Sequence, residues 1–140
     1  MLAQASNDYF NDPVVDLGYV RYRGSTALRS QFSADVYDGI SYVQAPMGQL
    51  RWQPLQNIEG HKDYNACEVI GVQNPGPSCF QGVPAWQLAV KEAGLARETG
   101  HEDCLLLEVY VPEKPRSTAL PVLLYIHGGG YATGGAGEYP

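Results

Sequence analysis

The stretch LPVLLYIHGGGY, residues 120–131, decides how the rest of this 140-residue chain is interpreted. Residues 122–126 form a continuous apolar run that is too short for a helix, follows Pro121 and ends before three glycines. Such a run is typical of a strand that is buried on both faces inside a parallel sheet. We therefore expect a central strand here, followed at once by a sharp glycine turn.

The turn itself carries a motif, HGGG at residues 127–130. Glycines let the backbone turn sharply and approach a ligand, because they have no Cβ. Their N–H groups can then face a developing negative charge, and HGGG after a strand is typical of an oxyanion-hole loop. The alternative interpretation is a flexible glycine loop, which the glycine-rich residues 134–137 also fit.

Composition and charge exclude several classes of protein. Hydrophobic residues make up 44% and charged residues 17% of the chain, which excludes a disordered segment and a coiled coil. The net charge of −6 disfavours a nucleic-acid or anionic-membrane surface. We expect no signal peptide, because residues 1–6 show neither a basic nor a long apolar stretch, and no transmembrane segment, because no apolar run is long enough. We expect residues 1–140 to belong to a single domain without an internal boundary.

The cysteines and histidines fit no zinc pattern, so we expect no metal site. The cysteine count is odd, which leaves at least one thiol outside any disulfide within the chain. The residues concerned are Cys67, Cys79 and Cys104, with His61, His101 and His127.

Strand patterns precede the central run. Residues 14–22 alternate partly and indicate a strand or hairpin near a sheet edge. Residues 36–43 are the next strand candidate, broken by Gly39. After them we expect a loop whose Leu50 and Trp52 are anchored in the core.

The second half of the chain is less regular. Residues 53–82 are rich in proline and glycine and predict a long irregular segment. Residues 85–98 are the one good helix candidate, because their apolar side chains share one face. Residues 104–112 predict a strongly buried strand, and a short polar loop suggests that it forms a hairpin with residues 120–126.

Several stretches together resemble the type-B carboxylesterase, lipase and cholinesterase family of α/β-hydrolases. Order and spacing agree from about Val20 to the last residue, and the cysteine stretch is similar to the secreted fungal lipase branch. The matching stretches are DGISY at 38–42, APMGQLRW at 45–52, PSCFQ at 77–81, EDCL at 102–105, VYVP at 109–112 and residues 120–131.

The resemblance implies an α/β fold, namely the N-terminal part of an α/β-hydrolase and incomplete as a domain. Its parts would be edge strands, a disulfide loop with one helix, and a strand leading to the oxyanion-hole loop. The helix at 85–98 would be either an interfacial lid, as in the lipase branch, or an amphipathic surface helix. Gly129 and Gly130 would donate the oxyanion-hole N–H groups. His127, Gly128 and Tyr131 would support that loop, with His127 orienting it and not serving as the catalytic base.

Structural residues are also implied by the resemblance. It pairs Cys79 with Cys104 in a disulfide and leaves Cys67 out of the bond, which implies secretion into an oxidising compartment. It pairs Arg51 with Glu102 in a largely buried ion pair that ties the 46–52 loop to the base of the disulfide loop.

The function implied is that of a serine carboxylic ester hydrolase, which acts on an ester or lipid and needs no cofactor. Its Gly-x-Ser-x-Gly elbow and the acid and histidine of its triad are not among these residues. We therefore expect the chain alone to be inactive and to fold poorly. Its partner would be the C-terminal remainder of the hydrolase, in cis or as a second chain. The alternative is a non-catalytic adhesion or scaffolding protein of the same fold.

Overall fold

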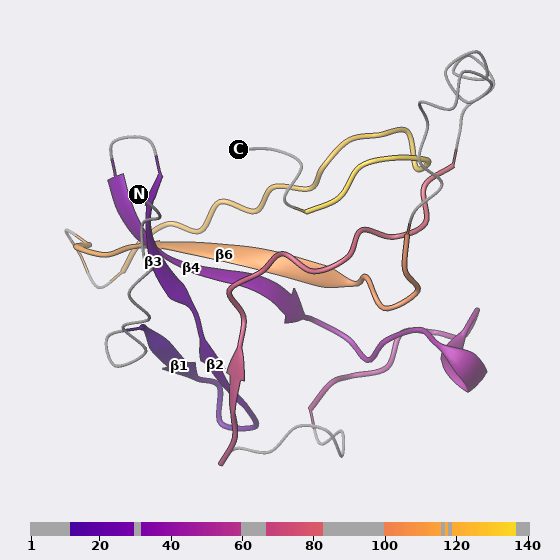
Figure 1. The fold of residues 1–140 in the computed structure, drawn as a ribbon, viewed down its shortest axis with the longest axis horizontal. Coiled ribbons are helices and arrows are strands. Elements are labelled where there is room, and N and C mark those ends of the chain that lie inside the picture. The colour runs from indigo at the N-terminus through magenta and orange to yellow at the C-terminus, as the bar shows by residue number, and fades with distance from the viewer. Residues whose placement is uncertain are drawn as a thin grey trace, which may run out of the picture.

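The structure is a computed structural model, in which the described residues form two small sheets and one short 3-10 helix, η1 (Figure 1). The described residues are 12–29, 32–59, 67–82, 100–115, 117 and 119–136. The elements in chain order are β1 (Val14–Asp16), β2 (Arg21–Arg23), β3 (Ser25–Arg29), β4 (Phe32–Ser41), η1 (Gly48–Leu50), β5 (Val69–Gly71) and β6 (Leu106–Pro112).

The first sheet has the strand order β1-β2-β5. β1 and β2 are antiparallel, and the Leu17 N–H donates to the Val20 carbonyl at 3.0 Å to close their turn. Gly18 supplies the positive φ of 85° that this turn requires. Of the two possibilities for residues 14–22, a strand or a hairpin near a sheet edge, the structure shows the hairpin, with β1 at the edge. β5 then adds to β2 in parallel register.

The second sheet has the order β3-β4-β6, and both pairings are antiparallel. β4 pairs with β6 along most of its length, with a register shift between Tyr37 and Ile40. Gly39 lies inside that shift at a φ of 78°, and a Cβ there would lie 2.5 Å from the Asn74 carbonyl oxygen. The predicted break at Gly39 is thus a bulge within one continuous strand.

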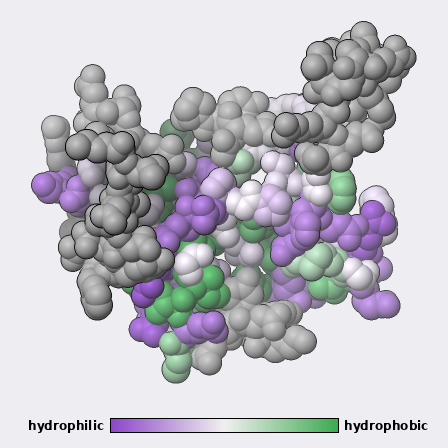
Figure 2. Space-filling view, in the orientation of Figure 1, coloured by the Kyte–Doolittle hydropathy of each residue, from purple (hydrophilic) through white to green (hydrophobic). Residues whose placement is uncertain are grey.

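The two sheets are joined by backbone hydrogen bonds and by a small apolar core. Backbone hydrogen bonds of 2.8 Å run from the Asp38 N–H to the Val72 carbonyl and from the Val72 N–H to the Arg23 carbonyl. Figure 2 shows apolar patches over the β1-β2-β5 sheet, bordered by hydrophilic side chains. The buried cluster consists of Val20, Tyr22, Tyr37 and Val72.

The last described segment, residues 119–136, is here named the glycine arm. In Figure 1 it follows β6, runs back along the sheet as an extended trace and folds back at its glycines. The strand expected at 122–126 is not formed, and Val122 is 93% exposed. A strand needs a neighbour that offers N–H and C=O groups, and the described residues provide none beside this run.

The expected hairpin between residues 104–112 and 120–126 is also wrong. β6 pairs with β4 instead. The C-terminal half of β6 is more exposed than predicted, with Val109 38% exposed. Trp52 is not a core anchor, because its side chain is 88% exposed. The helix expected at 85–98 lies outside the described residues. Within the described part of the chain, no helix is long and apolar enough to cross a bilayer.

Candidate functional site

The glycine loop, residues 127–134, closes around one carbonyl group. The Gly129 carbonyl oxygen accepts hydrogen bonds from the N–H groups of Ala132 and Thr133, each at 3.1 Å, and from Thr133 Oγ1 at 3.3 Å. Gly129 and Gly130 have φ angles of 126° and 60°, in the region that favours glycine. Three converging donors therefore fix the orientation of the peptide that joins these two residues.

The orientation of the carbonyls fixes the orientation of the N–H groups. In a planar trans peptide, the C=O and the N–H of the next residue point in opposite directions. The Gly129 carbonyl faces Thr133, so the Gly130 N–H faces away from the turn. The Gly128 carbonyl accepts from His127 Nδ1 at 2.8 Å, so the Gly129 N–H points away from that ring. Within the described residues, neither glycine N–H donates a hydrogen bond.

Close backbone contacts keep the loop compact. A Cβ on Gly129 would fall 1.8 Å from the Thr133 carbonyl oxygen, and substitution there would force the turn apart. A Cβ on Gly134 would meet the Gly128 oxygen at 2.5 Å and His127 Nδ1 at 2.6 Å. The backbone of Gly134 thus packs directly on the start of the HGGG motif.

The two other loop residues that the resemblance singles out are His127 and Tyr131. His127 Nδ1 lies 2.8 Å from the carbonyl oxygen of the following residue, Gly128. Tyr131 has a φ of 60°, an unusual value for a tyrosine, and its side chain is fully exposed. It contributes to the turn through its backbone conformation.

A disulfide joins the base of β6 to the segment before residue 83. Cys79 and Cys104 are bonded, with their Cα atoms 5.0 Å apart, and these are the two cysteines that the resemblance pairs. Cys67 is exposed and lies outside this bond. The sequence resemblance includes Gln81 in the PSCFQ stretch but assigns it no role. Its amide contacts the glycine loop at Gly134.

Arg51 and Glu102 form an ion pair. The pair is not largely buried, which corrects the expectation, since the two side chains are 54% and 35% exposed. The loop from Pro46 to Trp52 lies at the surface, so water reaches both charges. The Arg51 guanidinium also lies over the Trp52 ring, 5.1 Å from its centroid.

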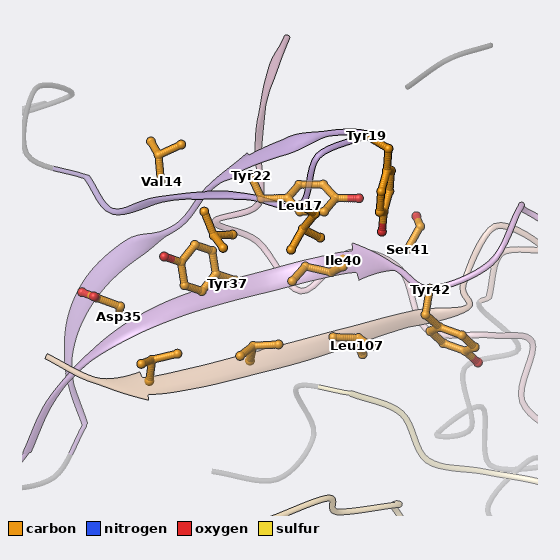
Figure 3. Close-up of a pocket in the computed structure, with 13 residues that line it drawn as sticks. Val14, Leu17, Tyr19, Tyr22, Asp35, Tyr37, Ile40, Ser41, Tyr42 and Leu107 are labelled. Atoms are coloured by element: carbon orange, nitrogen blue, oxygen red, sulfur yellow. The ribbon is translucent and has the colours of Figure 1, made fainter. Parts of the chain in front are cut away.

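A separate pocket of about 570 Å³ lies between the β1–β2 hairpin and the face of β4 and β6 (Figure 3). Its lining is mostly apolar, with Tyr19, Tyr22 and Tyr37 among its members, and it includes no residue of the glycine arm. Burial raises the pKa of Tyr37, and the nearby Asp35 carboxylate adds to the effect. Tyr37 therefore stays protonated at neutral pH. In the described residues, no cluster of three or more His, Cys, Asp or Glu side chains could hold a metal ion.

The fold of this chain has counterparts in solved esterases. Aspergillus niger EstA aligns with a TM-score of 0.63 and 28% identity, over 86% of this chain and 20% of that one. A thermophilic PNB esterase aligns with a TM-score of 0.60 and 30% identity, over 86% of this chain and 22% of that one. The chain therefore has the fold of the corresponding part of α/β-hydrolase esterases.

The sequence places it more narrowly. A model of the carboxylesterase family matches residues 11–140, and the chain belongs to that family. A carboxylic ester hydrolase of Bombus ignitus is 38% identical over 101 residues, 71% of this chain and 17% of its own length. Carboxylesterase 1F of Mus musculus is 31% identical over 134 residues, 91% of this chain and 23% of its own length. The chain thus spans about a fifth of the length of these relatives.

Proposed function

We propose that this chain supplies the oxyanion-hole loop of a serine carboxylic ester hydrolase. The observation that carries the proposal is the orientation of the Gly129 and Gly130 N–H groups. Both point away from the bonded carbonyls, and neither donates to another described residue. Such N–H groups are suited to bind an oxygen that gains negative charge. Membership of the carboxylesterase family supports this role.

The proposed mechanism is acyl transfer through a tetrahedral intermediate. A serine outside these residues attacks the ester carbonyl and passes its proton to a histidine base, while the C=O π pair moves onto oxygen. The Gly129 and Gly130 N–H groups bind that oxyanion, and one such donor is worth roughly 3–4 kcal/mol of barrier. Collapse of the intermediate expels the alcohol, and water then releases the acid. No cofactor takes part.

The whole catalytic triad would come from the remainder of the hydrolase, in cis or as a second chain. This sequence contains no Gly-x-Ser-x-Gly elbow, and its serines have no such context: Ser6, Ser25, Ser30, Ser33, Ser41, Ser78 and Ser117. The 140 residues alone would therefore hydrolyse no ester. The Cys79–Cys104 disulfide supports an oxidising, extracellular compartment for the enzyme.

The test uses the complete polypeptide that carries this segment, with a short-chain nitrophenyl ester as substrate. Gly129→Ala should lower kcat at least about 10²-fold, because it displaces an oxyanion donor. Gly18→Ala is the matched control, since Gly18 also has a positive φ but a Cβ there meets nothing within 4 Å. Gly18→Ala should retain kcat.

Two results would contradict the proposal. A folded complete polypeptide without turnover would favour the non-catalytic adhesion or scaffolding protein. Equal kcat values for Gly129→Ala and Gly18→Ala would place the oxyanion donors elsewhere.

A further inference from the structure

One side chain connects the disulfide region to the glycine loop, and it is Gln81. Its Oε1 accepts a hydrogen bond from the Gly134 N–H at 2.7 Å. Its Nε2 donates to the Gly134 carbonyl at 3.2 Å and to the Cys79 carbonyl at 2.8 Å. A carboxamide is the side-chain group that offers an acceptor and two donors together. Gln81 thus holds both polar groups of a residue 53 positions away.

The residue that Gln81 holds lies against the proposed oxyanion site. Gly134 approaches the Gly128 oxygen and His127 Nδ1 so closely that a Cβ would lie within 2.6 Å of both. Movement of Gly134 therefore changes the space available to the first residues of the HGGG motif. The neighbouring Gly82 N–H donates to the Ala132 carbonyl at 2.6 Å and adds a second tie to the loop.

The segment that carries Gln81 is itself fixed from the opposite side. The disulfide bonds Cys79 to Cys104, and the His101 N–H donates to the Ser78 carbonyl at 3.0 Å. Gly100 packs on the backbone of Phe80, where an added Cβ would lie 2.3 Å from the Cα atom. The short strip of residues 78–82 is thus held by the base of β6 on one side and holds the glycine loop on the other.

We propose that Gln81 is a positioning residue for the oxyanion-hole loop, acting through Gly134 on His127 and Gly128. The inference rests on the proposed function, because it assigns Gln81 a task at that same site. Gln81 touches no reacting atom. Its effect is to set where the Gly129 and Gly130 N–H groups point when the oxyanion forms.

The test replaces Gln81 by methionine in the complete polypeptide, which removes all three hydrogen bonds at similar volume. The matched control is Gln73→Met. Gln73 is also part-buried, and its Nε2 bonds Asp12 at 2.9 Å and the Gly24 carbonyl at 2.8 Å, away from the glycine loop. The readouts are kcat, KM, the affinity for a tetrahedral boronic acid, and amide hydrogen exchange of residues 128–134.

Gln81→Met should lower kcat about tenfold, less than the ~10²-fold cost of losing a whole oxyanion donor. KM should stay within about twofold, because ground-state binding of the ester does not use the oxyanion donors. Boronic acid affinity should fall in parallel with kcat, and exchange in the glycine loop should accelerate. Gln73→Met should leave all four readouts of the site unchanged.

A Gln81→Met enzyme with the kcat and boronic acid affinity of Gln73→Met would overturn the inference, whatever its stability. A different result would contradict the proposed function, namely the absence of ester turnover in the unsubstituted polypeptide. In that case hydrogen exchange decides: faster exchange at 128–134 in Gln81→Met alone supports positioning by Gln81, and equal exchange in both variants overturns it.

Discussion

Two β-type stretches of the chain, β4 and residues 122–126, have opposite environments. β4 lies between β3 and β6, and its Val36 is 1% exposed. The run at residues 122–126 is more apolar than β4, since all of its side chains are hydrophobic, yet Val122 is 93% exposed and the run lies outside the described sheets. The difference shows that an apolar pattern favours an extended backbone, but that a strand forms only where a neighbouring segment pairs with its N–H and C=O groups.

The two regions meet at a narrow joint. The disulfide, the strip of residues 78–82 and the hydrogen bonds of Gln81 connect β6 to the glycine loop. The sheets fix the position of the joint, and the joint fixes the position of the glycine loop. Substitutions at the joint should therefore have larger effects than substitutions at exposed positions of either region.

Loss of the disulfide should have the largest effect on stability. Replacing Cys79 and Cys104 together by serine opens a loop of 25 residues, which costs about 3.5 kcal/mol in the chain-entropy model. Cys67→Ser is the control, and it should change the free energy of unfolding by less than about 0.5 kcal/mol. Urea unfolding of the complete polypeptide measures both values. Equal losses in the two variants would show that the bond does not secure the joint.

The packing of Gly100 on the joint should come next. Gly100→Ala places a methyl group against the Phe80 backbone and should cost about 2 kcal/mol through overpacking. Gly71→Ala is the matched control, because a Cβ there meets nothing within 4 Å. It should be neutral within about 0.5 kcal/mol. Thermal unfolding compares the two variants, and a neutral Gly100→Ala would mean that the strip of residues 78–82 moves freely.

One valine substitution in each region tests the difference between β4 and residues 122–126. In the complete polypeptide we expect residues 122–126 to be a buried central strand, so Val122→Ala should cost about 2 kcal/mol, as should Val36→Ala. The free energy of unfolding by denaturant gives both values. If only Val36→Ala is destabilising, the 122–126 run stays at the surface in the complete polypeptide as well.

The ion pair should have the smallest effect. Arg51 and Glu102 are both partly exposed, so water screens their attraction and Glu102→Gln should cost about 0.5 kcal/mol. Arg51→Leu also removes the contact with the Trp52 ring and should cost about 1 kcal/mol. The loss should shrink at 1 M salt. A loss of several kcal/mol in melting experiments would indicate a pair that becomes buried in the complete polypeptide.

Local patterns predicted the local structure well. The hairpin at the start of the described chain follows from alternation and a glycine turn, and the bulge in β4 follows from Gly39. These features depend on residues within about ten positions of one another, where backbone sterics and turn chemistry decide.

Features that depend on distant partners could not be predicted in the same way. The apolar pattern of residues 104–112 carries no information that β4 is the partner of β6. The exposure of Trp52 and Arg51 depends on what packs over their loop. The role of Gln81 requires Gly134 to lie beside it, and no spacing rule joins residues 53 positions apart.

The most direct test of the oxyanion-hole assignment removes one N–H group and no other atom of the backbone scaffold. Glycolic acid in place of Gly130 turns its peptide into an ester, and the same exchange at Gly18 removes an N–H that bonds the exposed Asp16 carboxylate. In the complete polypeptide, the Gly130 exchange should lower kcat for a nitrophenyl ester about 10²- to 10³-fold, with the Gly18 exchange near the unsubstituted value. An unchanged kcat after the Gly130 exchange would contradict the assignment.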